Sequence, residues 1–365
     1  MTRREVLALL GGAAGIGAAP VAVARHPAYD DELTAVLSKM FRQIGGLQRL
    51  VKGKTVTVKL NLTGSPALRV EGRPLGLTHY THPRTAGAMA HLLGRAGARR
   101  IRFVESCWAT AGPLDEYLLD SGWNIRALIN AAPGVEFENT NALGTGARYA
   151  RLEVPGGGLV FPAYDVNHSY QDTDVLVSMA KLKNHEICGV TLAMKNMFGI
   201  TPASIYGDDA GRDEPNESPG KGRSETCHLG RRQPAASAPP ELDPASSRDP
   251  GHRMPRITAE LNAARPVGIA FIDGIETLAG GEGPWNRNVR PVKPGLLILG
   301  TNAVSTDAVA AALMGYDPRA PRGVPPFANC DNTLLLAEQL GLGSADLNQI
   351  EVRGVPLAQA VYPFG

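Results

Sequence analysis

The stretch VLVSMAKLKNHEICGVTLAMKNMFGIT, residues 175–201, decides which fold the rest of the chain builds. Its first part, residues 175–179, is an apolar run typical of a buried strand. Basic and amide side chains follow in residues 181–201, namely Lys181, Lys183, His185, Lys195 and Asn196. Ammonium groups among apolar neighbours cost free energy unless an anion, a carboxylate or water meets them. We therefore expect binding groups at a strand end; the alternative is lysines that reach solvent and a structural histidine.

Two further strands are predicted upstream, at residues 55–60 (TVTVKL) and 101–105, with a helix from Pro83 to about residue 97 between them. A strand, a crossover helix and a second strand form a parallel unit whose carboxyl ends meet at one sheet edge. Lys59 and Asn61 end the first strand, and Glu105 ends the second. Ligands of doubly wound sheets bind beyond such ends, so we expect a site there. Glu105 is a candidate general base or, equally, the counter-ion of Lys59.

Alternating helical and strand patterns continue to the end of the chain. Helices are expected at residues 31–41, 114–132, 188–197, 257–264, 301–314 and 332–340, and strands at 135–138, 149–154, 267–272, 296–299 and 350–352. The strand at 267–272 ends in Asp273, a second candidate base. Together these elements predict an α/β protein with a mostly parallel, Rossmann-like sheet flanked by helices, in one lobe or two closely joined lobes.

A long irregular insertion interrupts this pattern at residues 203–255. It is rich in Gly, Pro, Ser and charged residues and has no clear period. Such a connection is far longer than the ~4 to 6 residues usual in compact domains, which favours either a lid over a site or a disordered linker. Arg231 and Arg232 lie within it, and guanidinium groups suit the capture of carboxylate or phosphate.

The first 24 residues resemble an export signal. Arg3 and Arg4 precede a weakly apolar run, and Ala22 and Ala24 form an A-x-A cleavage pattern. Adjacent arginines after Thr2 resemble a twin-arginine signal, which implies the twin-arginine export machinery as a partner and a periplasmic or otherwise extracytoplasmic location. The alternative is the first helix of a cytoplasmic protein. Residues 25–365 are then expected to form a single α/β domain.

The composition excludes several classes of function. Formal net charge is +2, with 37 basic and 35 acidic residues, so no global field attracts nucleic acid. No apolar run after the signal is long enough for a membrane span. The four cysteines form no CxxC pair, so neither a zinc ribbon nor an iron–sulfur motif is expected, and free buried thiols are. His79 and His82 favour a substrate mouth over a metal site, because Pro83 places them in a loop.

Four motifs resemble the family called domain of unknown function 362. They are VKLN at residues 58–61, VSMAKLKNHEICGVTLAMKNMFG at 177–199, FIDGIETLAGGEGP at 271–284 and VSTDAVAAALMGYDP at 304–318. The resemblance covers most of residues 55–318 and implies no activity. Some relatives carry a ferredoxin-like iron–sulfur module, but the cysteine spacing of this chain departs from theirs. The insertion interrupts the matching span.

The leading functional hypothesis is an exported enzyme that acts on a small anionic substrate. Lys59, Lys181, Lys183 and Lys195 would hold the anion, helped by Asn61, Asn196, Arg231 and Arg232. Glu105 or Asp273 would act as general base and His185 as acid. No cofactor is identified; a divalent cation held by Glu105, Asp273 and Glu282 ranks second. The alternatives are a non-catalytic ligand-binding protein and a redox or maturation accessory protein.

Overall fold

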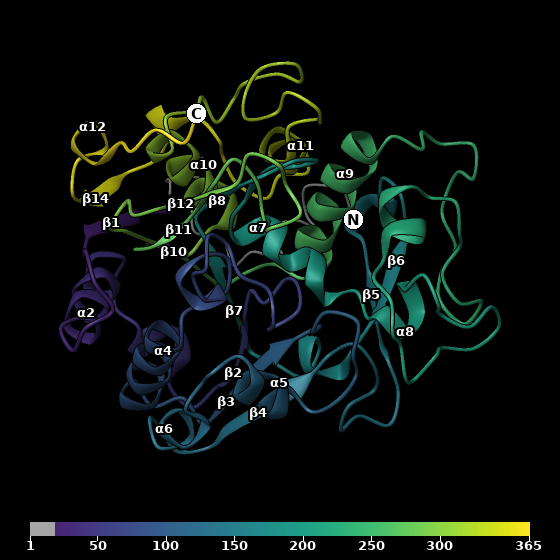
Figure 1. Cartoon of the computed structure of the whole chain (residues 1–365), viewed down its shortest axis with the longest axis horizontal. Helices are drawn as coiled ribbons and strands as arrows, with labels where there is room; N and C mark the ends of the chain where they lie inside the picture. The colour runs from purple at the N-terminus through teal and green to yellow at the C-terminus, as the bar shows by residue number, and fades with distance from the viewer. Residues whose placement is uncertain (1–18) are drawn as a thin grey trace, which may run out of the picture.

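One eight-stranded sheet runs through residues 19–365, the part of the chain that this computed structural model describes (Figure 1). Its strand order is β14-β1-β13-β10-β7-β2-β3-β4. The strands are β1 (Val21–Arg25), β2 (Thr55–Lys59), β3 (Arg100–Glu105), β4 (Val135–Asn139), β7 (Val175–Lys181), β10 (Ile269–Gly274), β13 (Leu296–Gly300) and β14 (Val352–Gly354). All neighbours from β10 to β4 are parallel, whereas β13 runs antiparallel to β10 and β1. The prediction of a mostly parallel, Rossmann-like α/β sheet is confirmed.

Helices cover both faces of the sheet, and Figure 1 shows α2, α4 and α6 on one side of it and α9, α10 and α11 on the other. The first layer comprises α2 (Leu33–Gln43), α3 (Gln48–Val51), α4 (Pro83–Arg95), α5 (Leu114–Asp120) and α6 (Ile125–Ile129). The second comprises α7 (Ala193–Asn196), α8 (Ala203–Tyr206), α9 (Pro250–Ala264), α10 (Ala303–Leu313), α11 (Thr333–Gln339) and α12 (Leu357–Ala360). Strand β7 feeds both cores, because Val175, Val177 and Met179 face the first layer while Leu176 and Ala180 face the second.

Three short hairpins sit beside the main sheet. They are β5 (Ala150–Glu153) with β6 (Ala163–Val166), β8 (Lys183–His185) with β9 (Gly189–Thr191), and β11 (Thr277–Ala279) with β12 (Arg290–Val292). The helix predicted at residues 188–197 is wrong in its first part, where the chain forms the second strand of the β8–β9 hairpin. Gly189 has φ +74°, and a Cβ there would collide with the Phe327 ring. The helix is therefore restricted to α7 and a following 3-10 turn, Met197–Ile200.

Strand β1 lies where the sequence predicts the end of an export signal. Val21, Ala22 and Val23 are buried, and the strand pairs with β13 on one side and β14 on the other. A boundary after Ala24 falls inside this strand, so residues 21–24 belong to the folded domain. Alternating Val and Ala suits both an A-x-A cleavage pattern and a buried strand. Arg3, Arg4 and the apolar run before residue 19 lie outside the described residues.

Buried polar contacts join the insertion at residues 203–255 to the start of helix α9. Arg253, on α9, is buried and forms an ion pair with Glu241, which is also buried. Arg248 donates to the same carboxylate at 3.0 Å, and Gln233 donates to it at 3.1 Å. A buried charge is stable only when it is paired and hydrogen-bonded in this way. Helix α9 itself starts at Pro250 rather than at residue 257, with Asp249 accepting a bond from Gly251 N at 3.0 Å.

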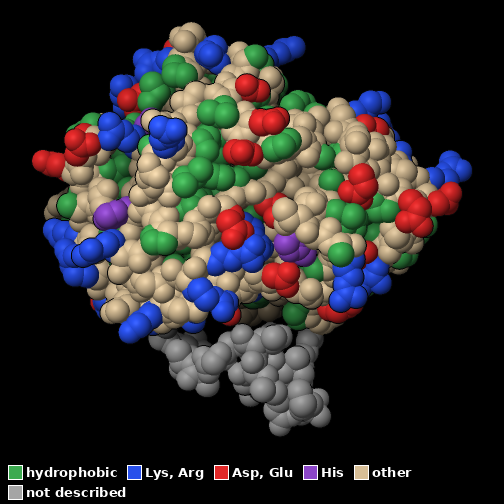
Figure 2. All heavy atoms as spheres, turned by 90° about the horizontal axis from the view of Figure 1, so that it is seen from below, with side chains coloured by type: hydrophobic (Ala, Val, Ile, Leu, Met, Phe, Trp, Pro, Cys, Tyr) green, Lys and Arg blue, Asp and Glu red, His purple; other side chains and the backbone are tan. Residues whose placement is uncertain are grey.

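Other features agree with or refine the sequence predictions. The helix expected at 114–132 is broken at Gly122, whose φ is +80°, into α5 and α6. All four cysteines are buried and unpaired, as expected. Among the helices of residues 19–365, none has the length and apolar character that a membrane span requires. Figure 2 shows basic and acidic side chains interspersed on one face of the molecule, in keeping with the near-zero net charge.

Candidate functional site

The direction of the chain through the sheet changes beside β2. Strands β3 and β4 follow on one side of it, whereas β7, β10 and β13 follow on the other. At such a switch point the connections leave in opposite directions, and a crevice opens beyond the carboxyl ends of the two central strands. A cavity of about 350 Å³ lies here, lined by residues that follow β2, β3 and β7 and by part of the insertion. This volume is at the lower end of the range for small-molecule sites.

Many of the predicted site residues line this one cavity. They are Lys59, Asn61, Glu105, Lys183, His185, Lys195 and Asn196. They come from β2, β3, the β8–β9 hairpin and α7, so segments more than a hundred residues apart in the sequence meet at one edge of the sheet. The cavity also contains Glu282, which the sequence suggests only as a ligand of a divalent cation, and charged and aromatic groups that were not predicted: Arg223, His228, Trp108, Phe198 and Trp285.

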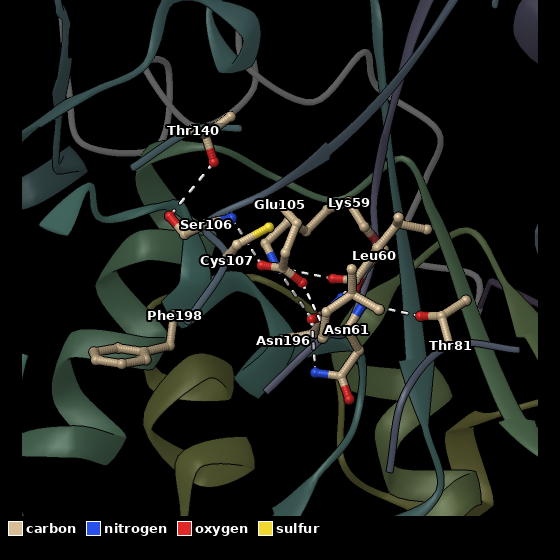
Figure 3. Close-up of polar contacts among 12 residues, drawn as sticks. Lys59, Leu60, Asn61, Thr81, Glu105, Ser106, Cys107, Thr140, Asn196 and Phe198 are labelled. Atoms are coloured by element: carbon tan, nitrogen blue, oxygen red, sulfur yellow. Dashed lines mark hydrogen bonds and ion pairs between the residues drawn. The ribbon is translucent and has the colours of Figure 1, made fainter. Parts of the chain in front are cut away.

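Lys59 and Glu105 form a buried ion pair at the floor of the cavity (Figure 3). The Lys59 ammonium also donates to Leu60 O at 2.8 Å, while Glu105 accepts from Leu62 N at 2.8 Å and Ser106 N at 2.9 Å. Burial lowers the pKa of Lys59 and raises that of Glu105, and the attraction between the two groups opposes both shifts. Both Glu105 oxygens are thus occupied, which favours the counter-ion role over that of a general base.

Two amides extend this ion pair into the cavity. Asn61 Nδ2 donates to Asn196 Oδ1 at 3.1 Å (Figure 3). Asn196 Nδ2 in turn donates to Ser178 Oγ at 3.0 Å. The buried Asn61 Oδ1 has no hydrogen-bond partner among residues 19–365. Gly199 closes over the ion pair, since a Cβ there would lie 2.8 Å from Lys59 Nζ. This wall therefore offers Asn61 Oδ1 as an acceptor to a ligand.

Three cations line the cavity without a carboxylate partner. Within residues 19–365, Lys183, Lys195 and Arg223 have no carboxylate oxygen within 4.0 Å of their charged nitrogens. Lys195 Nζ lies over the Phe198 ring at 4.3 Å, and Lys183 Nζ donates to the backbone oxygen of His79 at 2.9 Å. Cations held together in low dielectric repel one another and favour an anion between them.

Arg223 reaches the cavity from the insertion and is held at its base. Its Nε donates to Thr201 O at 2.6 Å, and its Nη2 donates to Asn141 Oδ1 at 2.7 Å. Burial lowers the pKa of the guanidinium. The group nevertheless stays charged, because the ordinary pKa of an arginine is far above neutral pH. Arg223 therefore supplies a fixed positive charge, and the insertion forms one wall of the cavity.

Lys183 titrates near neutral pH. Burial lowers its pKa to about 7; Glu282 opposes this shift, and the charges of Lys181 and Lys195 add to it. Burial also lowers the pKa of Lys195, against attraction from the Cys188 sulfur and Glu282. Lys183 can therefore lose or gain a proton at physiological pH, which is the property required of a general acid–base group.

His185 lies beside Glu282 and remains neutral near pH 7. Burial lowers the pKa of the ring to about 3. Its Nδ1 accepts from Ile187 N at 3.3 Å, so the neutral ring carries its proton on Nε2. Burial disfavours the charge of Glu282, yet its pKa is about 2, lowered by His185 and by hydrogen bonds from Trp285 Nε1 (2.8 Å) and Glu186 N (3.0 Å). Those bonds keep Glu282 ionised while His185 is neutral.

Lys181 and Asp273 occupy a separate, closed network. The Lys181 ammonium donates to Asp273 Oδ2 at 3.2 Å, to Glu276 O at 2.7 Å and to the Tyr29 hydroxyl at 2.8 Å. The Tyr29 hydroxyl in turn donates to Asp273 Oδ1 at 3.0 Å. Both charged side chains are fully buried and neither lines the cavity. The expectation that they share the site with Lys183 is corrected, because Tyr29, from a distant part of the sequence, completes the network.

Arg231 and Arg232 also lie outside the cavity. They line a different hollow of about 650 Å³, together with Arg212. Arg231 is exposed and lies 3.8 Å from Glu225, and Arg232 donates to the backbone oxygens of Asp208 and Ala210. The basic residue that the insertion brings to the cavity is Arg223. Arg231 and Arg232, which the sequence suggests for this role, do not line it.

Asp307 explains how the last of the motifs contributes to the site. It is buried on α10, and its carboxylate accepts from Ala193 N at 2.9 Å and Met194 N at 2.8 Å, the first two residues of α7. Those amides would otherwise have no partner inside the helix. Asp307 thus fixes the short helix that carries Lys195 and Asn196.

The three carboxylates considered for a divalent cation each have a separate partner. Glu105 pairs with Lys59, Asp273 pairs with Lys181, and Glu282 lies beside His185. Among residues 19–365, no group of three or more His, Cys, Asp or Glu side chains is placed to hold a metal ion.

The fold and cavity define a doubly wound α/β protein with a cationic cavity at the switch point of its sheet. The sequence pattern of the family described as "Domain of unknown function (DUF362)" matches residues 56–312, so the chain belongs to this family. The match includes β2, β7, β10 and most of α10, the elements that carry the four motifs.

Two individual proteins are also similar to this chain. Thylakoid-associated protein sll1697 of Synechocystis sp. is 26% identical over 198 residues, which are 53% of this chain and 55% of that protein. The chain thus spans about half the length of this curated relative. A crystal structure of a Thermotoga maritima protein covers 73% of this chain and 55% of its own, with 15% identity and a TM-score of 0.37, a likeness too low to carry an argument.

Proposed function

We propose that this protein is an enzyme that binds a small carboxylate or phosphate anion in the switch-point cavity and acts on it. The observation that carries the proposal is the set of three cations, Lys183, Lys195 and Arg223, which line one cavity of about 350 Å³ without a carboxylate partner among residues 19–365. Placing such charges together costs free energy in the folded protein, and a bound anion offsets that cost.

The cations would have different roles. Arg223 and Lys195 would hold the anion by charge-assisted hydrogen bonds. Lys183, with a pKa of about 7, would take a proton from the ligand and return it. His185 would donate a hydrogen bond from Nε2 as a neutral ring rather than act as an acid. Glu105 would keep Lys59 in place, and Lys181 and Asp273 would maintain the sheet.

A non-catalytic binding protein is the second candidate. The observation that favours it is that both cavity carboxylates, Glu105 and Glu282, are already occupied by fixed hydrogen-bond donors. A catalytic carboxylate needs a free oxygen within reach of the ligand's proton. The two candidates share the anion site and differ in whether the bound compound is converted.

We also propose that the protein is exported in folded form. The support is the sequence alone: adjacent Arg3 and Arg4 before an apolar run, a pattern similar to twin-arginine signals. Export in the folded state fits a site assembled from distant segments, because such a site exists only after the chain has folded.

Isothermal titration with inorganic phosphate and with acetate tests the anion site. We expect binding of at least one of them, and we expect Lys195→Met to weaken it by about tenfold or more, the usual value of one charge-assisted hydrogen bond. Lys221→Met is the matched control, since Lys221 is an exposed lysine of the insertion outside the cavity. It should bind within about twofold of the unchanged protein.

The enzyme and the binding protein are separated by a second measurement. Native mass spectrometry of protein purified from its own host identifies a copurifying anion, which is then incubated with the unchanged protein and with Lys183→Met. Conversion that is lost in Lys183→Met supports the enzyme, and retention of the unaltered compound supports the binding protein. The proposal of an anion site fails if Lys195→Met and Lys221→Met bind phosphate and acetate equally, or if the unchanged protein binds neither.

A further inference from the structure

Two half-exposed tryptophans lie at the mouth of the cationic cavity. Trp108 is 51% exposed and Trp285 is 47% exposed. Both line the cavity that contains Lys183, Lys195 and Arg223. The other large hydrophobic side chains of similar exposure among residues 19–365 are aliphatic and lie elsewhere on the surface. Aromatic residues make up only 5% of the chain, so the presence of both exposed rings at one opening needs a physical reason.

Trp285 is held rigidly although its ring faces solvent. Its Nε1 donates to Glu282 Oε1 at 2.8 Å, and its edge meets the His79 ring with centroids 6.0 Å apart. Gly64 lies against the other part of the indole, since a Cβ there would come within 3.0 Å of Trp285 Cζ3. A ring fixed in this way presents a preformed flat surface and loses little conformational freedom when a ligand covers it.

Trp108 approaches the same opening from the end of β3. It follows Glu105 by three residues, and the next residue, Ala109, has φ +47°, a conformation that non-glycine residues rarely adopt. Gly222 of the insertion faces the ring, with Trp108 Cζ3 at 3.8 Å from the position of a Cβ. The strained turn and the glycine together keep the indole at the cavity and leave its surface open.

We propose that the anion bound in this cavity carries a planar aromatic ring, which rests against Trp108 and Trp285 while the charged group meets the three cations. This inference rests on the proposed function and names its ligand class: aromatic or heteroaromatic carboxylates and phosphates. Flat rings stack on indole surfaces with a gain of about tenfold in affinity. The cavity is small, so the ring lies at its mouth rather than at its floor.

Titration with phenyl phosphate, methyl phosphate and glucose 6-phosphate tests this class of ligand. The three probes share a phosphate monoester and differ in what they place at the mouth. We expect phenyl phosphate to bind at least about tenfold more tightly than the other two. We expect it to quench tryptophan fluorescence, because two of the three tryptophans of the chain line the cavity.

Variants of the rings separate the inference from the anion site. Trp108→Ala should remove most of the advantage of phenyl phosphate over methyl phosphate and leave the affinity for methyl phosphate within about twofold. Trp285→Ala should also reduce this advantage, but it removes the hydrogen bond to Glu282 as well, so only the ratio of the two affinities is compared and circular dichroism checks that the fold is retained. Trp123→Phe, which alters a buried tryptophan outside the cavity, should change neither affinity.

The remaining outcomes each contradict the inference. Equal binding of phenyl and methyl phosphate overturns the aromatic ring and leaves the anion site intact. Tighter binding of glucose 6-phosphate than of phenyl phosphate shows that the mouth accepts a sugar ring instead. If none of the three probes binds, the inference fails, and the proposed function fails with it when neither inorganic phosphate nor acetate binds. If phenyl phosphate keeps its full advantage in both tryptophan variants, the rings are not its contact.

Discussion

At the scale of single residues, Lys183 carries the chemistry on which the account depends. It is buried in the cavity wall, its ammonium donates to a backbone oxygen, and burial lowers its pKa to about 7. A lysine in this state is an acid–base group as well as a cation. By contrast, the buried Lys181 is fully paired with Asp273 and Tyr29 and is part of the scaffold. Two lysines that are two residues apart thus have different roles.

The titration of Lys183 predicts a pH dependence of anion binding. The ammonium is charged below its pKa of about 7 and neutral above it, so affinity for sulfate, whose own charge is constant near neutral pH, should fall as pH rises from 6 to 9. With one proton bound per anion, the fall approaches about tenfold per pH unit. His185, with a pKa of about 3, does not contribute in this window. Isothermal titration at several pH values measures the slope.

Two variants check that the slope belongs to Lys183. Lys183→Met should bind sulfate weakly at every pH and show no slope. Because Lys183→Met removes a buried charge that has no carboxylate partner, this variant should also have a higher free energy of unfolding at pH 6, by on the order of 1–3 kcal/mol. Lys195→Met should keep the slope but move it to higher pH, because the charge of Lys195 lowers the pKa of Lys183. A slope that survives in Lys183→Met would assign the titration to another group.

At the scale of elements, strand β1 joins the N-terminal region to the core. It pairs with β13 over its full length and with β14 over three residues. Its alternating side chains enter both layers, Val21 and Val23 on one face and Ala22 on the other. Without β1, the edges of β13 and β14 would be exposed, and unpaired strand edges are prone to aggregation.

Truncation measures what β1 contributes. A chain of residues 25–365 should be less stable than a chain of residues 19–365 by at least about 3 kcal/mol, since two valines lose their burial and a central strand loses its partner. Urea unfolding followed by circular dichroism compares the two. Equal stability would mean that the strand is dispensable and that removal of residues 1–24 is compatible with the fold.

The insertion shows why some elements are beyond prediction from a sequence. Regular strands such as β2 and β3 can be predicted from the local pattern of their side chains. Lys59 and Glu105 could therefore be placed at a sheet edge from the sequence. Residues 203–255 have no such period, and their path is set by tertiary contacts such as the Arg253–Glu241 ion pair. Arg223 and His228 enter the cavity through those contacts, and nothing local distinguishes Arg223 from Arg231.

At the scale of the whole molecule, the site is a product of topology. The switch point beside β2 brings together groups from β2, β3, the β8–β9 hairpin, the loop between β11 and β12 that carries Glu282, and the insertion. The sequence predicts this edge because parallel strands align their carboxyl ends. It does not predict which strand-end charges face the cavity: Asp273 is closed off by Tyr29, a contact across 244 residues. Some residues of the four motifs thus line the cavity, whereas others, such as Asp273 and Asp307, support the elements around it.

The measurement that tests the central claim most directly is anomalous diffraction from crystals soaked in tungstate, a tetrahedral anion that resembles phosphate. The account predicts a peak in the switch-point cavity within hydrogen-bond reach of Lys183 Nζ, Lys195 Nζ and the Arg223 guanidinium, and its loss in Lys195→Met crystals. A cavity without a peak, while tungstate is seen beside Arg231 and Arg232, would contradict it.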